Sequence, residues 1–177
     1  AVDSWAADGD LTIRAAVAST PNGGRELVRR PAPGGEWETI HKWSAAELAW
    51  SVGASSDGST VYVIANHDAD TGRLLAVDLR SGEQTVLAED DTYDVGAAVF
   101  HPTRHHPQAA NVFGETRQWK IVDEEMAADF AALDAIQRGQ FQIVSRDVAD
   151  DLWVVNYDTD DASARVYLYE RATRTHR

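Results

Sequence analysis

Residues 47–89 alternate short hydrophobic runs with clusters of polar turn residues. In "STVYVIAN" at 59–66, hydrophobic side chains rich in β-branched residues fall on both faces of an extended chain. "ELAWSVGAS" before it, and "RLLAVDL" and "QTVLAE" after it, have the same character. Asp57-Gly58, "DADTG" and "RSGE" separate these runs with residues that suit tight turns. The pattern predicts four short strands joined by hairpins.

The same order of segments recurs along the chain. A turn followed by a strand also occurs at Asp8-Gly9, near position 103 in "VFHPTRHHPQAANVF" and near Asp150 in "SRDVADDLWVVNYD". The unit repeats about every 47 residues, and four strands in a unit of this length are typical of a β-propeller blade. A β-sandwich also has short strands, but it does not repeat its turn chemistry at this period.

We therefore expect an all-β, incomplete β-propeller of about four four-stranded antiparallel blades. They form a single domain with units at about 1–45, 46–92, 93–140 and 141–177.

One segment departs from the strand pattern. In "DEEMAADFAALDAIQRG" at 123–139, hydrophobic side chains recur at helical spacing. They are Met126, Phe130, Leu133 and Ile136. Asp123 suits the N-cap of a helix, and Arg138 and Gly139 suit its end. We expect one inserted α-helix near 124–137 that packs on the propeller, with a docking element for another domain as the alternative.

Charge and composition exclude several classes of binding partner and of site. The chain has 177 residues, 44% of them hydrophobic, and a formal net charge of −13. Nucleic acid and membranes are poor partners for such a chain, because phosphate binding requires clustered Lys and Arg. The absence of Cys excludes disulfides and cysteine-based metal sites. With no signal peptide or apolar membrane span in view, we expect a cytoplasmic protein. The missing initiator Met suggests a processed or excised piece.

A near match to a catalytic motif occurs at Gly53-Ala54-Ser55-Ser56-Asp57. The motif G-x-S-x-G needs Gly at its last position and a strand followed by a helix. Here Asp57 takes that position, and a turn with another strand is expected to follow. We therefore assign no catalytic residue in this chain.

Three histidines, His101, His105 and His106, raise the possibility of zinc. His105 and His106 are adjacent, so their side chains diverge on an extended backbone, and no Asp, Glu or Cys lies between the three. A solvated loop between strands is the better interpretation.

The segment Asp68-x-Asp70-x-Gly72 begins like a calcium loop, but its fifth and twelfth positions hold Gly72 and Leu79. A polar hairpin turn is favoured there, and likewise at Asp158, Asp160 and Asp161. No Gly-rich phosphate loop is present. We expect no metal and no cofactor, and we assign no substrate-binding residue.

Core packing between blades accounts for most of the six tryptophans, with one or two left to line an interface with another domain. They are Trp5, Trp37, Trp43, Trp50, Trp119 and Trp153.

Three long segments, at 55–90, 94–133 and 145–174, resemble the propeller domain of the prolyl oligopeptidase family of serine peptidases. The branch with the most similar segments is the bacterial acylaminoacyl-peptidase and dipeptidyl-aminopeptidase group. The resemblance implies a C-terminal α/β-hydrolase domain of the same polypeptide, with its nucleophile in G-x-S-x-G. It also implies that the propeller covers the active site and restricts the substrates to peptides. This chain contains no recognisable hydrolase domain, so on its own it would hydrolyse nothing.

The last unit predicts an incomplete outer strand. Aligning "VDLRSGEQTVLA" with "YERATRTHR" matches Gln84 with His176, so the final strand is expected to begin near His176. Because open strand edges readily pair, we expect a homo-oligomer formed through open blade edges. The alternative to a peptidase portion is a stand-alone propeller-like module that binds a protein or peptide. The reading frame beyond Arg177 distinguishes the two, since a peptidase requires further blades and a G-x-S-x-G segment.

Overall fold

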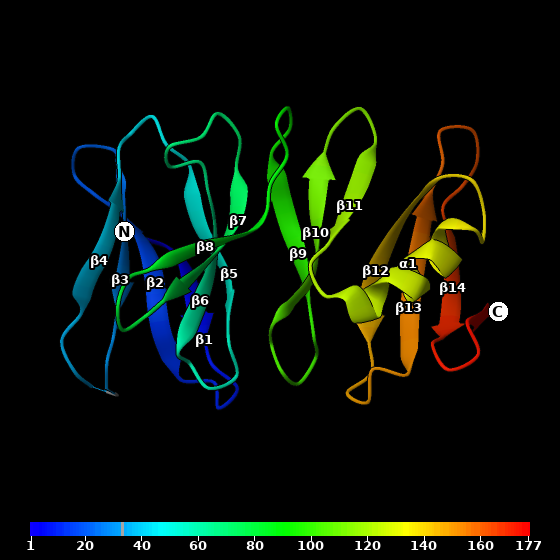
Figure 1. Cartoon of the computed structure of the whole chain (residues 1–177), viewed down its shortest axis with the longest axis horizontal. Helices are drawn as coiled ribbons and strands as arrows, with labels where there is room; N and C mark the ends of the chain where they lie inside the picture. Colours follow the sequence, from blue (N-terminus) through cyan, green and yellow to red (C-terminus); the bar gives the residue numbers. More distant parts are fainter. Residues whose placement is uncertain (33) are drawn as a thin grey trace.

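The computed structural model describes residues 1–32 and 34–177. Its strands form four antiparallel sheets, blades 1 to 4 in chain order, which stand side by side along the long axis of the molecule (Figure 1). Within every sheet, strands that are consecutive in the sequence are neighbours. The predicted all-β propeller architecture with one inserted helix is confirmed.

The strands have the following bounds. Blade 1 contains β1 (Val2–Ala7), β2 (Ile13–Ser19), β3 (Arg25–Arg29) and β4 (Glu38–Trp43). Blade 2 contains β5 (Ala49–Ala54), β6 (Thr60–Ala65), β7 (Arg73–Asp78) and β8 (Gln84–Ala88). Blade 3 contains β9 (Val95–Phe100), β10 (Pro107–Phe113) and β11 (Arg117–Ile121). Blade 4 contains β12 (Gln140–Arg146), β13 (Leu152–Asp158), β14 (Arg165–Glu170) and β15 (Thr175–His176).

Turn chemistry explains why the strands fold back on one another. Between β5 and β6, the Asp57 carboxylate accepts hydrogen bonds from Ser59 N at 3.0 Å and from Ser55 Oγ at 2.6 Å. Gly58 has a φ of +69°, which costs glycine little and other residues much. The chain therefore reverses sharply here and pairs Ala54 with Val61.

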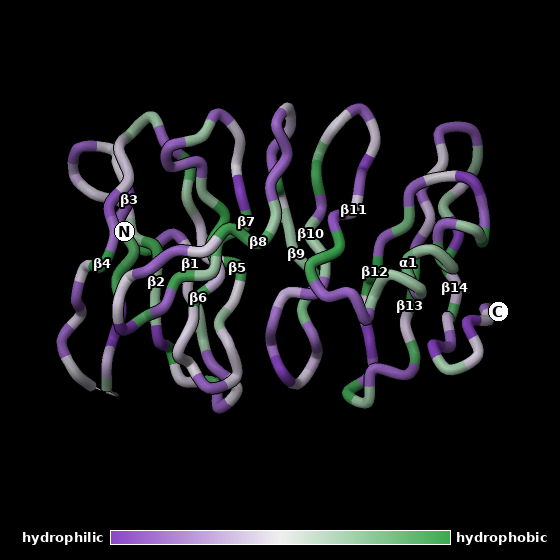
Figure 2. Tube along the Cα trace, in the orientation of Figure 1, coloured by the Kyte–Doolittle hydropathy of each residue, from purple (hydrophilic) through white to green (hydrophobic). Residues whose placement is uncertain are grey.

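The blades pack face to face. Between blades 1 and 2, small residues such as Ala6 and Ala15 lie in one buried cluster with Leu27 and Val63. The small side chains let β1 and β5 approach closely enough for Ser51 N to donate to Ser4 Oγ at 2.9 Å. Hydrophobic residues follow the strands, whereas the loops at both ends of the blades are mostly hydrophilic (Figure 2).

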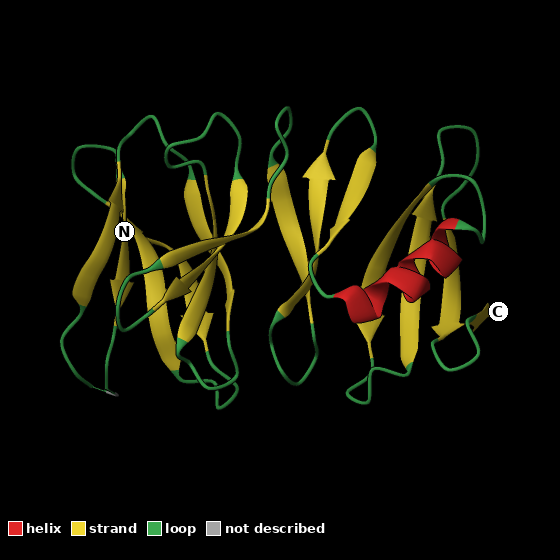
Figure 3. Ribbon diagram, in the orientation of Figure 1, coloured by secondary structure: helices red, strands yellow, loops and turns green. Residues whose placement is uncertain are grey.

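The prediction of four strands in each blade is wrong for blade 3, whose sheet has three strands. After β11 the chain forms the 3₁₀ turn η1 (Glu124–Met126) and then α1 (Ala127–Asp134), which lies against blade 4 (Figure 3). Asp123 caps this segment as predicted, since its side chain accepts a hydrogen bond from Glu125 N at 3.1 Å.

The predicted C-terminal end of the helix near 137, closed by Arg138 and Gly139, is wrong. The helix ends at Asp134, because the chain must reverse within five residues to enter β12 at Gln140. Gly139 serves that reversal instead, with a φ of +130°, and an added Cβ would lie only 2.6 Å from Asp158 O.

The predicted hydrophobic stripe of the helix is confirmed. Met126, Phe130 and Leu133 are buried, and Ile136 packs against the same cluster. With eight residues, α1 is too short to cross a bilayer, and no other helix among residues 1–32 and 34–177 has the length and hydropathy of a membrane span.

Candidate functional site

The structure places Ser55 in a hairpin turn. It follows β5 directly, its hydroxyl donates to Asp57 at 2.6 Å, and the chain continues into β6. The segment is therefore a strand, a turn and a strand, as predicted, whereas a nucleophile elbow is followed by a helix.

The histidine segment forms the loop between β9 and β10. His101 Nδ1 accepts hydrogen bonds from the backbone N–H groups of Thr103 and Arg104, and the His101 ring stacks on His106 with centroids 5.4 Å apart. His106 Nε2 lies 2.9 Å from Asp123 Oδ2, which lowers the pKa of Asp123. The sequence analysis missed this pair, because the two residues are distant in the chain.

The two acidic motifs both lie at turns. Asp68, Asp70 and Gly72 are between β6 and β7, whereas Asp158 ends β13 and Asp160 and Asp161 lie in the turn that leads to β14. Across the residues that the structure describes, no group of three or more His, Asp or Glu side chains is arranged to hold a metal ion.

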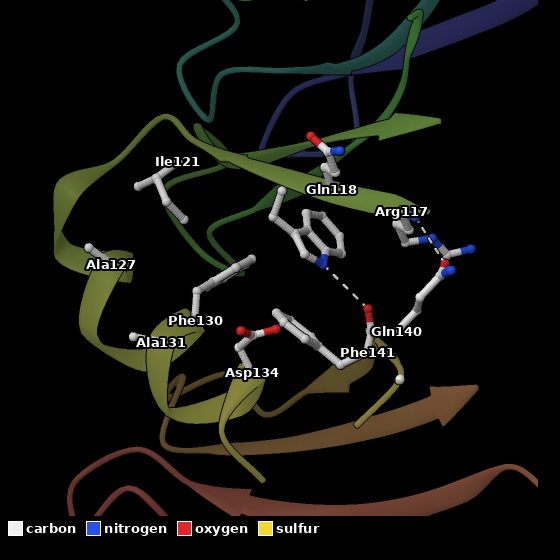
Figure 4. A pocket seen from close by; sticks show the side chains of 11 residues that line it. Arg117, Gln118, Ile121, Ala127, Phe130, Ala131, Asp134, Gln140 and Phe141 are labelled. Atoms are coloured by element: carbon white, nitrogen blue, oxygen red, sulfur yellow. Dashed lines mark hydrogen bonds between the residues drawn. The ribbon is translucent and has the colours of Figure 1, made fainter. Parts of the chain in front are cut away.

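An aromatic groove between blades 3 and 4 is the candidate functional site (Figure 4). We define it by six of its lining residues: Trp119, Ile121, Ala127, Phe130, Ala131 and Phe141. The groove has a volume of about 410 Å³, enough for one large side chain and adjacent backbone.

Three aromatic rings form the floor of the aromatic groove. The ring centroids of Trp119 and Phe130 are 5.4 Å apart, those of Trp119 and Phe141 are 5.8 Å apart, and those of Phe130 and Phe141 are 5.4 Å apart. Trp119 Nε1 also donates to Phe141 O at 3.3 Å. This bond satisfies the indole N–H and ties β11 to β12, so the floor is a fixed apolar surface.

A second hollow of about 630 Å³ continues from the aromatic groove. The two share Arg117, Gly139, Gln140 and Asp134. Four carboxylates line this hollow, and we call it the acidic end: Asp134, Asp158, Asp160 and Asp161. Two guanidinium groups, of Arg117 and Arg138, also line it, so the balance of charge is negative.

Buried hydrogen bonds hold α1 in place at the side of the aromatic groove that it lines. The Asp129 carboxylate, 5% exposed, accepts from Tyr169 Oη and from Arg171, both at 2.9 Å. Tyr157 Oη donates to the backbone oxygen of Leu133 at 2.6 Å. Burial raises the pKa of Tyr157 and of Tyr169 far above its ordinary value, so both hydroxyls remain donors. The groove is thus formed before any ligand arrives.

A buried ionic cluster, centred on Asp150, also stabilises blade 4. Asp150 Oδ1 accepts from Arg146 at 3.0 Å and from Trp153 Nε1 at 2.8 Å, and its Oδ2 accepts from Arg171 at 2.7 Å. Both guanidinium groups lie over the Trp153 ring, at 5.3 and 5.0 Å from its centre. Arg146 also donates to Phe100 O and to Gln108 in blade 3, so the cluster joins two blades.

Exposed large hydrophobic side chains concentrate on the two end blades. On blade 1 they are Val2, Trp5, Leu11, Ile13 and Trp37, and on blade 4 they are Val144, Val148, Leu152 and Val166. Trp5, 54% exposed, packs against Trp37 with ring centroids 6.0 Å apart, and Arg30 lies over the Trp37 ring. By contrast, Trp43 and Trp153 are buried core residues, as expected for most of the tryptophans.

The residues around the aromatic groove supply apolar surface, carboxylates and main-chain groups, a set suited to binding rather than to bond cleavage. The sequence analysis assigned no site here. The available signal was the alternation of Arg117, Trp119 and Ile121 directly before the inserted helix. It shows that these three share one face, but not which partner lies opposite.

The sequence of the chain was compared with those of known proteins. No protein-family model matches the chain. Over 176 residues the chain is 32% identical to dipeptidyl aminopeptidase BIII from Pseudoxanthomonas mexicana, a match that covers 98% of this chain and 25% of the relative. The chain thus spans about a quarter of the length of this curated relative.

Two solved structures share the fold. TolB from Acinetobacter baumannii superposes with a TM-score of 0.61 at 13% identity, covering 99% of this chain and 42% of TolB. A puromycin hydrolase mutant in complex with PGG superposes with a TM-score of 0.57 at 17% identity, covering 100% of this chain and 28% of that protein.

The sequence match along nearly the whole chain, together with the four stacked blades, shows that this chain is similar to a portion of the β-propeller domain found in the prolyl oligopeptidase family.

Proposed function

We propose that this chain is the non-catalytic propeller portion of a prolyl-oligopeptidase-type serine peptidase. In this role it covers the active site of an α/β-hydrolase domain in the same polypeptide and restricts the substrates to peptides. The observation that carries the proposal is the 32% identity to a dipeptidyl aminopeptidase of which the chain spans only 25%. The rest of such a protein has room for further blades and a catalytic domain.

The exposed hydrophobic residues of the end blades support this role. Trp5 and Trp37 on blade 1, and Val144 and Val166 on blade 4, lie on sheets that have a neighbouring blade on one side. Exposed apolar patches are typical of interaction sites, and Trp5 and Trp37 form such a patch with their ring centroids 6.0 Å apart. Further blades of the same propeller would bury these faces in the way that blades 1 and 2 bury their shared face.

Rigid blades suit a filter that acts by size. Ser51 N to Ser4 Oγ joins blades 1 and 2, and Arg146 joins blades 3 and 4. A folded domain is about 30 Å across, whereas an extended peptide is about 10 Å thick. A wall that does not open widely would therefore admit the peptide and exclude the folded protein.

The first test is the gene sequence beyond the codon for Arg177. The proposal requires further blades and then a hydrolase domain with G-x-S-x-G. An intact gene that stops without a hydrolase domain would contradict the proposal and favour a stand-alone module that binds a protein or peptide.

The second test is a chimera. The corresponding quarter of the Pseudoxanthomonas mexicana enzyme is replaced by residues 1–177, and hydrolysis of a chromogenic dipeptidyl substrate, a longer peptide and a folded protein is measured. We expect the two small substrates to be cleaved and the folded protein to remain intact, as with the unmodified enzyme. A variant of the enzyme that lacks this quarter of its chain provides the control, and we expect it to lose the discrimination. Equal discrimination with and without the quarter would refute the filtering role.

A further inference from the structure

The aromatic groove runs along an open sheet edge. Strand β11 is the outer strand of its sheet, because the chain leaves blade 3 for α1 instead of adding a fourth strand. Phe113, which pairs with Arg117, donates its N–H to Asp94 O, away from β11. Since paired residues in an antiparallel sheet alternate between bonded and non-bonded, Arg117, Trp119 and Ile121 direct their main-chain groups toward the open edge.

The contact of Gln140 with β11 shows that a main-chain N–H of this edge takes a hydrogen-bond acceptor from outside the sheet. The Gln140 side-chain oxygen takes a hydrogen bond from Arg117 N at 3.1 Å, in the place where an added strand would supply a carbonyl. Beyond Arg117, the outward main-chain groups of Trp119 and Ile121 lie beside the aromatic floor. A strand that pairs there gains both main-chain hydrogen bonds and apolar burial, the combination used in recognition by strand addition.

The acidic end sets the charge of the ligand. It continues from the groove at the Arg117 end of β11, and Thr116, three residues before Trp119, also lines it. A peptide that pairs antiparallel to β11 has its C-terminal side at this end. Because alternate residues of a strand share a face, a basic side chain about four residues after the residue on the aromatic floor therefore meets the carboxylates of Asp134, Asp158 and Asp160.

We propose that the aromatic groove binds an extended peptide segment. The segment adds to β11 as a fourth antiparallel strand, places an apolar side chain on the floor formed by Trp119, Phe130 and Phe141, and places a Lys or Arg side chain at the acidic end. This inference does not depend on the proposed function, because it rests on blades 3 and 4 and on α1 alone.

The probe is the peptide acetyl-Ala-Ala-Phe-Ala-Ala-Ala-Lys-Ala with a C-terminal fluorescein, titrated with the 177-residue protein while fluorescence anisotropy is recorded. We expect saturable binding that weakens as salt is added, because the Lys contacts are screened. A peptide with N-methyl groups on the amides flanking Phe cannot donate to β11, and a peptide with Glu in place of Lys meets like charge. We expect both to bind at least about tenfold more weakly.

Matched protein variants locate the site. Ala131 on α1 is exposed and lines the aromatic groove, so Ala131→Gln should fill the space and weaken binding about tenfold. Ala128→Gln changes an exposed residue of the same helix outside the groove and should leave binding unchanged. The double variant Asp158→Asn and Asp160→Asn should weaken binding about threefold and flatten its salt dependence. All these positions are exposed, so the fold should be retained, which circular dichroism confirms.

Three results would each overturn the proposal. The first is no saturable binding up to about 1 mM protein, the weakest affinity relevant to a peptide site. The second is equal binding of the N-methylated peptide, which would exclude strand addition. The third is equal binding by Ala131→Gln, which would place the peptide elsewhere on the molecule.

Discussion

Replacing Asp150 by Asn tests whether the buried ionic cluster stabilises blade 4. Asp150 is 3% exposed and lies at the centre of Arg146, Arg171 and Trp153. It also has a φ of +62°, a conformation that Asn tolerates as well as Asp does. The substitution therefore removes the charge and one acceptor oxygen without disturbing the turn.

The expected loss of stability follows from the groups that remain buried when the Asp150 carboxylate is removed. In the variant an NH₂ group faces a guanidinium, and two guanidinium groups stay over the Trp153 ring without the carboxylate between them. Arg146 and Asp150 are 6% and 4% exposed, so water does not compensate. Removing one partner of a buried ion pair costs about 3–5 kcal/mol, and the low end applies because Asn retains one acceptor. For a chain of this length, about 3 kcal/mol corresponds to a fall in Tm of about 6–12 °C.

Thermal unfolding followed by far-ultraviolet circular dichroism measures the effect. Asp151→Asn is the matched control, because Asp151 is the exposed neighbour in the same turn, and its Tm should stay within about 2 °C of the parent protein. If Asp150→Asn lowers Tm no more than Asp151→Asn does, the cluster contributes no net stability and the reasoning is refuted.

Three further predictions concern other parts of the molecule. Burial, and then the neighbouring His67, lower the pKa of His41, so the neutral form is favoured in the folded state. The free energy of unfolding should keep its full value at pH values above 6.5, the ordinary pKa of histidine, and should decrease below pH 6.5 by at most about 1.4 kcal/mol per pH unit. Unfolding midpoints of His41→Gln that decrease as steeply with acid as those of the parent protein would contradict this. Self-association through the end blades should increase with ionic strength, because salt screens the net charge of −13, and Trp5→Ser should reduce it; sedimentation velocity that shows a monomer at every salt concentration would exclude it. Tyr169→Phe deprives the buried Asp129 of a donor and should cost about 1–2 kcal/mol and speed proteolysis within α1, whereas unchanged cleavage would show that the helix is held by packing alone.

The sequence predicted the blades because their determinants are local. The turn at Asp57-Gly58 needs only its own side chains, and the alternation along β6 needs only its own residues. The stripe on α1 was equally visible.

The features that the sequence analysis missed depend on residues that are distant from one another in the chain. Trp119 becomes the floor of a groove only because Phe130 and Phe141 meet it from other elements. The link between Asp150 and Arg171 spans 21 residues and two strands. The end of α1 is set by where β12 begins rather than by the helix formers that follow Asp134. Charge and periodicity carry no information about such tertiary contacts.

Blades that contact only their neighbours behave as a linear chain of coupled units. The free energy that holds any one blade is then its own term plus one coupling for each occupied face. Blades 2 and 3 have two such couplings, and blades 1 and 4 have one each within the described residues. Opening should therefore begin at either end and move inward, so that the amides of β6 and β10 exchange last and those of β4 and β15 exchange first.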